Sequence, residues 1–133
     1  MMTKLGINNP DKSGGPHALK LTNVSEWMIF AGHAALGKHG EILFPGDALS
    51  QLRWIYGSLK KTLEQEGYFL SNVVQLKMTC TNEVTVSERV QFLNIVREVF
   101  KDTTIPPMGA TMSVVHGLAY PGMLCEVDIL AAK

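Results

Sequence analysis

The sequence has 133 residues, of which 46% are hydrophobic and 18% are charged, and its formal net charge is zero. A chain of this length forms one domain around one core, so residues 1–133 are expected to be a single domain. The even charge balance, without a basic patch, excludes a surface that follows a nucleic-acid backbone. Abundant apolar residues with few charges predict an oligomer whose subunits bury apolar faces against one another.

The N-terminus lacks the charged-then-apolar pattern of a secretion signal, and no apolar run approaches 18 residues. Cys80 and Cys125 lie far apart in the sequence, each within an apolar alternating run. Two reduced, buried thiols are favoured over a disulfide, although the sequence leaves both open. We therefore expect a cytoplasmic protein with no membrane association.

Short strands are predicted in the N-terminal third of the chain. The region up to Pro16 is rich in turn-forming residues, which indicates a loop with one short strand at Lys4–Ile7. Further strands are expected at Ala18–Thr22, Glu26–Gly32 and Glu41–Phe44, separated by turns.

Two amphipathic helices follow. Asp47 is a suitable N-cap for the first, whose apolar residues recur at spacings of three and four as far as Glu66. Gly67 ends that helix. Thr85 and Glu88 form a T-x-x-E capping box for the second helix.

The remaining elements are strands. Apolar and polar residues alternate through Val74–Thr81, which predicts a half-buried strand between the two helices. Pro106 and Pro107 end the second helix, and strands are expected at Ala110–Val115 and Met123–Ala131. This order predicts an α+β architecture: one sheet with both helices packed on one face.

The sequence contains no motif that is typical of a metal-binding or nucleotide-binding site. His17, His33, His39 and His116 are spread over separate loops and strands, without H-x-x-x-H or C-x-x-C spacing. The sequence also lacks a phosphate loop and a dinucleotide fingerprint in the required context. We therefore expect no metal and no cofactor.

Glu126 is the acidic residue most suited to chemistry. It shares one face of the last strand with Leu124, Asp128 and Leu130, and no Lys or Arg occurs between Asp102 and Ala132. One interpretation is a solvated sheet face. The other is that a second subunit covers this face, so that Glu126 is partly desolvated and suited to proton transfer.

Weaker candidates lie on other elements. Asn94 interrupts the apolar stripe of the second helix, which taken alone is usual for a surface residue. His33 follows Gly32 at the end of a strand, where a ligand can approach the backbone closely.

Several motifs, in this order and at these spacings, resemble those of the RidA/YjgF family of reactive-intermediate deaminases. Gly15-Pro16-His17-Ala18 resembles the family's G-P-Y-S, and the strand ending in Ala31-Gly32-His33 resembles its S-G-Q. The second helix resembles N-x-x-Y-x-x-F through Asn94 and Phe100. Pro107 to Thr111 is similar to P-x-R-x-T, and residues 124–128 are similar to L-V-E-I-E. The resemblance covers about residues 15–131.

This resemblance implies a chorismate-mutase-like fold that assembles as a homotrimer around a barrel-like core, with an active site in each cleft between subunits. Members of the family hydrolyse imines and enamines to a keto acid and ammonia without a cofactor. An arginine holds the substrate carboxylate, a glutamate at the position of Glu126 positions water and transfers protons, and a tyrosine and a Ser-Gly backbone line the cleft.

The sequence departs from the family pattern at four of these positions: Gly109 replaces the arginine, His17 and Arg97 replace tyrosines, and Ala31 replaces the serine. Glu126, Asn94, Gly32, Thr111 and Pro107 are retained. A glycine cannot supply the charge-assisted contacts of an arginine, so we expect a substrate other than 2-aminoacrylate.

Our leading hypothesis is a divergent deaminase with Glu126 and His17 as catalytic residues. Its small-molecule substrate would contact Ala31, Gly32, His33, Asn94, Gly109 and Thr111. The alternative is a homotrimer that binds a small ligand, or acts like a chaperone, without catalysis. The resemblance also raises ribonuclease activity, but the sequence has no basic stripe and no histidine pair that would support it.

Overall fold

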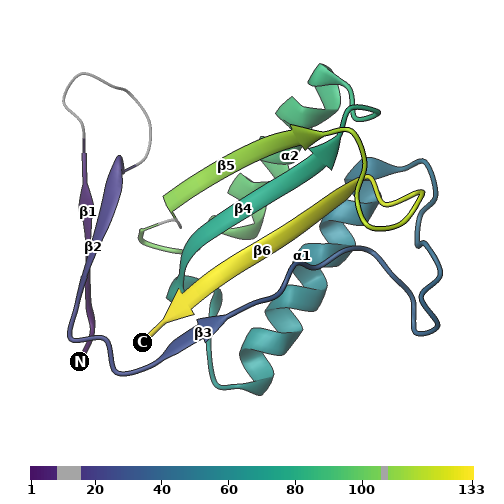
Figure 1. Ribbon diagram of the computed structural model, residues 1–133. Helices are drawn as coiled ribbons and strands as arrows, with labels where there is room; N and C mark the ends of the chain where they lie inside the picture. Colours follow the sequence, from purple (N-terminus) through teal and green to yellow (C-terminus); the bar gives the residue numbers. More distant parts are fainter. Residues whose placement is uncertain (9–15, 106–107) are drawn as a thin grey trace.

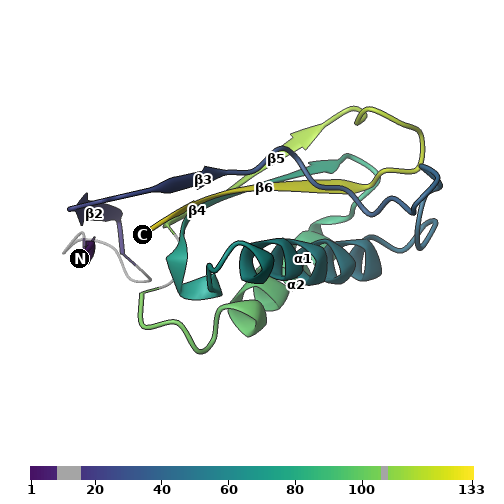
Figure 2. The same ribbon diagram turned by 90° about the horizontal axis from the view of Figure 1, so that it is seen from below.

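The computed structural model has two layers, a sheet and a pair of helices, with a small two-stranded sheet beside them (Figures 1 and 2). It describes residues 1–8, 16–105 and 108–133. The elements run in the order β1 (Thr3–Ile7), β2 (Ala18–Thr22), β3 (Trp27–Ile29), α1 (Ala48–Gln65), the 3-10 turn η1 (Leu70–Asn72), β4 (Val73–Thr81), α2 (Val86–Val99), β5 (Met108–Val115) and β6 (Cys125–Ala132). The predicted α+β fold with both helices on one face of a mixed sheet is confirmed.

The main sheet has the strand order β3-β6-β4-β5. β4 and β5 are parallel and joined through α2, whereas β6 is antiparallel to both β3 and β4. β1 and β2 form a separate antiparallel pair. The last strand of the chain is therefore inserted between β3 and β4, and this brings Glu126 into the middle of the sheet.

The two helices begin where the sequence predicts. The carboxylate of Asp47 accepts a hydrogen bond from the Ser50 amide at 3.0 Å, which caps α1. The hydroxyl of Thr85 accepts from the Glu88 amide while the Glu88 carboxylate accepts from the Thr85 amide, which is the predicted capping box of α2. Gly67 has a φ of +75°, a conformation that glycine adopts without steric cost.

The pleat of the sheet separates two faces. Leu76, Met78 and Cys80 of β4 and the odd-numbered residues of β6 are buried beneath the helices. The other face, which we call the open face, carries the alternate residues. These are Trp27, Ile29, Gln75, Lys77, Thr79, Thr111, Ser113, Glu126, Asp128 and Leu130. Among the described residues, no helix covers the open face (Figure 2).

The β1–β2 pair is tied to the main body by one lysine. The Lys4 ammonium donates hydrogen bonds to the carbonyl oxygens of Ser71, Val73 and Ile105 at 3.0–3.3 Å. Burial lowers the pKa of Lys4, because the protonated form loses hydration. These contacts fix β1 to the segment after α1, through Ser71 and Val73, and to the segment after α2, through Ile105.

Two expectations need correction. The strand predicted at Glu41–Phe44 is absent from the described structure except for a single bridge between Leu36 and Ile42. Phe44 has a φ of +51° and is followed by Pro45, so the chain turns into α1 instead of extending. The strand predicted at Glu26–Gly32 is shorter, Trp27–Ile29. The sequence features at Gly15, Pro106 and Pro107 lie outside the described residues.

Both cysteines are buried and free, and they lie directly opposite each other on β4 and β6. Burial, with a smaller effect of Cys80, raises the pKa of the Cys125 thiol to about 12. A thiol with a raised pKa in the folded state stabilises the fold below its unfolded-state pKa, and this stability is lost as the pH rises above that value.

We therefore expect the free energy of unfolding to fall between pH 8 and pH 10, by about 1.4–1.9 kcal/mol for a thiol whose unfolded pKa is about 8.5–9. Urea unfolding at several pH values measures this slope. The Cys125→Ala variant is less stable at every pH but has a shallower slope, and an unchanged slope would contradict the assignment to Cys125.

Candidate active site

Glu126 lies half-buried on the open face, in the middle of the sheet. Thr79 of β4 is its direct antiparallel partner, and Ser113 of β5 lies opposite Thr79. Directly opposite residues in a sheet carry their side chains on the same face. A carboxylate and two hydroxyl groups therefore form a polar row across β6, β4 and β5.

Gly32 provides the space that the Glu126 side chain occupies. A Cβ atom built on Gly32 would lie 2.2 Å from Glu126 Oε1 and 2.7 Å from its carboxyl carbon, so a larger residue would displace the carboxylate. The backbone next to Gly32 is fixed to β6, since the His33 amide donates to the Val127 carbonyl at 2.7 Å and the Val127 amide donates to the His33 carbonyl at 2.9 Å. The carboxylate is thus held against the main chain of residues 31–33.

His33 is close to Glu126 in the chain fold but belongs to the other face. Its paired residue, Val127, is buried beneath the helices, and its ring lies 5.7 Å from the Phe30 ring. The Nδ1 atom contacts the Ala31 carbonyl at 2.8 Å. Because a carbonyl oxygen only accepts, Nδ1 carries the proton in this contact. The structure therefore brings Gly32 against Glu126, whereas the His33 side chain lies on the other face.

His17 lies at the other end of the open face. It is exposed and lines a shallow recess of about 350 Å³ with Trp27, Gln75 and Leu130, among others. Leu130 is four residues from Glu126, about 13 Å at the usual rise of a strand. Within one chain, His17 and Glu126 therefore do not share a site.

Gly109 and Thr111 lie on β5. Thr111 is opposite Lys77, which is opposite Asp128, so all three belong to the open face. The pairing of β4 with β5 is irregular between Gln75 and Lys77. Gln75 pairs with Met108 and Lys77 with Thr111, so Gly109 lies within this irregularity. β2, which follows His17, contacts β5.

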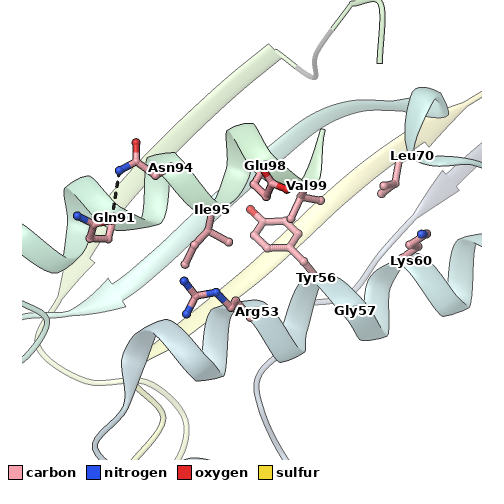
Figure 3. Close-up of a pocket in the computed structure, with 10 residues that line it drawn as sticks. All are labelled: Arg53, Tyr56, Gly57, Lys60, Leu70, Gln91, Asn94, Ile95, Glu98 and Val99. Carbon is pink, nitrogen blue, oxygen red and sulfur yellow. Dashed lines mark hydrogen bonds between the residues drawn. The ribbon is translucent and has the colours of Figure 1, made fainter. Parts of the chain in front are cut away.

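Asn94 is separated from the other candidates by the sheet itself. It lies on α2, where its amide nitrogen donates to Gln91 Oε1 at 3.2 Å (Figure 3). Its amide oxygen accepts from Arg97, also at 3.2 Å. The helices cover the face of the sheet opposite Glu126 (Figure 2). Asn94 therefore faces a different pocket, between α1 and α2.

Two further residues belong to the neighbourhood of Glu126. Thr79 is its cross-strand partner, and Thr81, two residues further along the same strand face, is buried with a hydroxyl that has no partner among the described residues. The polar positions of the alternating strand were visible in the sequence. Their position opposite Glu126 was not, because it depends on the pairing of β4 with β6.

Residues 1–8, 16–105 and 108–133 contain neither a metal-binding cluster nor a membrane-spanning helix. In this part of the chain, no three His, Cys, Asp or Glu side chains gather in a way that holds a metal ion. Within the same residues, no helix has the length and apolar character required to cross a bilayer.

Comparison with known proteins places this geometry in context. The model of the family described as Endoribonuclease L-PSP matches residues 15–133. The fold is similar to that of YyfB from Yersinia pestis, a protein of unknown function in the conserved Rid family, with a TM-score of 0.82 and 22% identity over 98% of both chains. No curated protein matches the sequence.

Two other solved structures share the fold at low identity. A protein of unknown function from Pseudomonas aeruginosa has a TM-score of 0.66 and 24% identity, over 99% of this chain and 94% of its own. A member of the YjgF/YER057c/UK114 family from Mycobacterium tuberculosis has a TM-score of 0.62 and 18% identity over 100% of both chains.

The contact between Gly32 and Glu126 predicts an energetic coupling. In the wild-type background, Gly32→Ala forces the carboxylate aside and destabilises the protein. In a Glu126→Ala background the same change is neutral or stabilises by about 0.4–1 kcal/mol, because it only restricts the unfolded chain. Urea unfolding of the four proteins measures the coupling. Equal effects in both backgrounds would show that the two residues do not compete for space.

Proposed function

Since the chain belongs to the Rid/YjgF family, described as Endoribonuclease L-PSP, we propose that it is a homotrimeric hydrolase that deaminates imines or enamines of small metabolites in clefts between subunits. The observation that carries this proposal is the position of Glu126. Its carboxylate is held against Gly32 on a sheet face that no described helix of the chain covers. An acid fixed there is available to a ligand bound between this face and another subunit.

The separation of the candidate residues supports a site built from two subunits. Glu126 and Gly32 lie toward one end of the open face, whereas His17 lines the recess at the other end. One chain cannot bring these groups to the same substrate. Two copies, packed so that the His17 end of one faces the Glu126 end of the next, would complete a cleft with polar groups on both walls.

The apolar part of the open face supports assembly. Trp27 and Ile29 of β3 are 52% and 80% exposed, and they lie beside Leu130 of β6. Large apolar side chains gathered on one sheet face mark surfaces that associate with another protein. We propose that this surface lies at the trimer interface.

The proposed chemistry needs one group that both accepts and donates a proton. The Glu126 carboxylate takes a proton from water as the water oxygen bonds to the imine carbon. Glu126 then returns this proton to the substrate nitrogen, which gives a carbinolamine. A second proton passes through Glu126 from the carbinolamine hydroxyl to the nitrogen as the carbon–nitrogen bond breaks, so that ammonia leaves and the carbonyl product forms. We assign the role of orienting the water or the substrate nitrogen to the hydroxyl group of Thr79, which is the direct cross-strand partner of Glu126.

The substrate is proposed to differ from that of arginine-containing relatives. Gly109 stands on β5 at the position that resembles the carboxylate-binding arginine, and it supplies neither charge nor side-chain donor. We propose that the substrate carries a bulkier or neutral substituent at this position. His17 is the polar group on the same side of the cleft.

The reaction consumes only water, so the proposal involves no cofactor. The two buried, free thiols fit a reducing compartment, and we propose the cytoplasm as the location. The endoribonuclease description of the family is not extended to this chain, because its net charge is zero and Lys77 on the open face lies opposite Asp128.

Replacing Glu126 by Gln is expected to lower kcat/KM at least 100-fold, as for loss of a general acid–base group. Ammonia release is followed with imines generated in situ by an amino acid oxidase from alanine, leucine and phenylalanine. Asp128→Asn is the matched control, since it removes a carboxylate from the same strand face and leaves activity near that of the wild type.

The same assay tests the substrate. The wild type is expected to prefer the bulkier imines to 2-iminopropionate, and Gly109→Arg to shift this preference toward 2-iminopropionate, whereas Gly109→Met does not. If neither wild type nor Glu126→Gln hydrolyses any imine, but both bind an apolar ligand equally, the protein is a non-catalytic binding trimer.

Assembly is tested independently of activity. Ile29→Asp is expected to convert trimers into monomers, because it buries a charge in the proposed interface. Val90→Asp, on the exposed surface of α2, is the control and leaves the trimer intact. Sedimentation velocity measures the masses, and a wild type that sediments as a monomer would refute the intersubunit site.

A further inference from the structure

A second pocket lies on the helix layer, on the opposite side of the molecule from the open face. It is a cavity of about 380 Å³ between α1 and α2 (Figure 3). This volume is within the range of small-molecule sites. No part of the function proposed above uses this pocket.

Tyr56 forms the inner wall of this pocket and holds an unsatisfied hydroxyl. The residue is 3% exposed, its ring packs edge-on against Phe100, and its oxygen has no hydrogen-bond partner among the described residues. A buried hydroxyl without a partner is costly and uncommon, because it has lost its water and gained nothing. The side chain points from α1 toward Glu98 and Val99 of α2 (Figure 3).

Glu98 lies near this hydroxyl at the edge of the pocket (Figure 3). Glu98 is exposed, and its carboxylate accepts a hydrogen bond from Lys101 at 3.0 Å, directed along the surface of α2. Exposed side chains change rotamer within nanoseconds, so Glu98 does not hold this edge of the pocket in one conformation.

Gly57 leaves the floor of the pocket open. It lies in the interior of α1, where glycine is a poor helix former compared with alanine. A Cβ atom added there would meet no described atom within 4 Å, so packing within this part of the chain does not require a glycine. The missing side chain of Gly57 instead leaves space between the helices.

Arg53 supplies a cation at one end of the pocket. It lies three and four residues before Tyr56 and Gly57, hence on the same face of α1. Its guanidinium extends toward Ile95 (Figure 3), and none of the ion pairs formed among the described residues includes it. Lys60, the other cation at the pocket, already faces Glu64 at 3.9 Å.

We propose that this pocket, which we call the α1–α2 pocket, binds a small organic carboxylate with an apolar, aromatic-sized body and an oxygen acceptor at its far end. The carboxylate pairs with the guanidinium of Arg53, whose planar fork matches it in two hydrogen bonds. The apolar body lies over Gly57 and Ile95. The far oxygen accepts the hydrogen bond that the Tyr56 hydroxyl otherwise lacks.

The charges of the pocket fix the orientation of the ligand. Arg53 attracts the carboxylate at one end, and Glu98 repels it from the other, where the Tyr56 hydroxyl lies. A ligand with two carboxylates is therefore disfavoured, whereas one with a phenol or carbonyl oxygen opposite its carboxylate suits both ends.

The test uses 3-(4-hydroxyphenyl)propanoate as the probe and calorimetry on the full-length protein. Saturable binding is expected, at least tenfold weaker with the corresponding amide and with Arg53→Gln. Lys61→Gln, which removes a neighbouring exposed cation of α1, is the matched control and binds as the wild type does. Absence of saturation at millimolar probe, or equal binding by Arg53→Gln, would overturn the proposal.

Two further variants separate the hydroxyl and the space. Tyr56→Phe is expected to fold normally and to lose at least fivefold in affinity for this probe, but not for 3-phenylpropanoate, which lacks the far oxygen. Gly57→Ala is expected to raise the Tm while weakening the binding of both probes. If Tyr56→Phe weakens both probes equally, the hydroxyl does not contact the ligand. Glu126→Gln should bind as the wild type does, so failure of the catalytic proposal leaves this result unaffected.

Discussion

The burial of a single face of the four-stranded sheet is the constraint on which the rest of the structure depends. α1 and α2 both pack against this face, so the side chains that alternate with Leu76, Met78 and Val127 are directed away from the core. The sheet can therefore carry a carboxylate on its open face without placing a charge among apolar side chains. Glu126 and Thr79 occupy that face because their strand neighbours are required by the core.

The contact between Glu126 and Gly32 gives the acid a fixed position. A side chain on Gly32 would occupy the place of the carboxylate, and the paired amides of His33 and Val127 hold this backbone against β6. A carboxylate held in one position on an uncovered sheet face is the feature on which the proposed imine hydrolysis rests. Under the proposed function, Gly109 at the arginine-like position sets the choice of substrate, while Glu126 carries the catalysis.

The elements whose signals are local were predictable from the sequence. The N-cap at Asp47 and the capping box of Thr85 and Glu88 each involve residues within one turn, and both helices begin as expected. The prediction of a strand at Glu41–Phe44 was wrong, because Phe44 adopts a positive φ as the chain turns into α1. The attachment of β1 through Lys4 was also not predictable, since its three carbonyl partners come from distant segments.

The sequence by itself determined which residues share a face of each strand and helix, because the side-chain periods of two and 3.6 are local properties of the backbone. It thereby assigned Glu126 to a face apart from the core. Only the tertiary structure decided what lies next to each face. It brought Gly32 against Glu126 and placed Asn94 on the other side of the sheet. It also left the Tyr56 hydroxyl, between two helices, with no hydrogen-bond partner among the described residues. These relations depend on the order in which distant strands pair, and a local pattern does not encode that order.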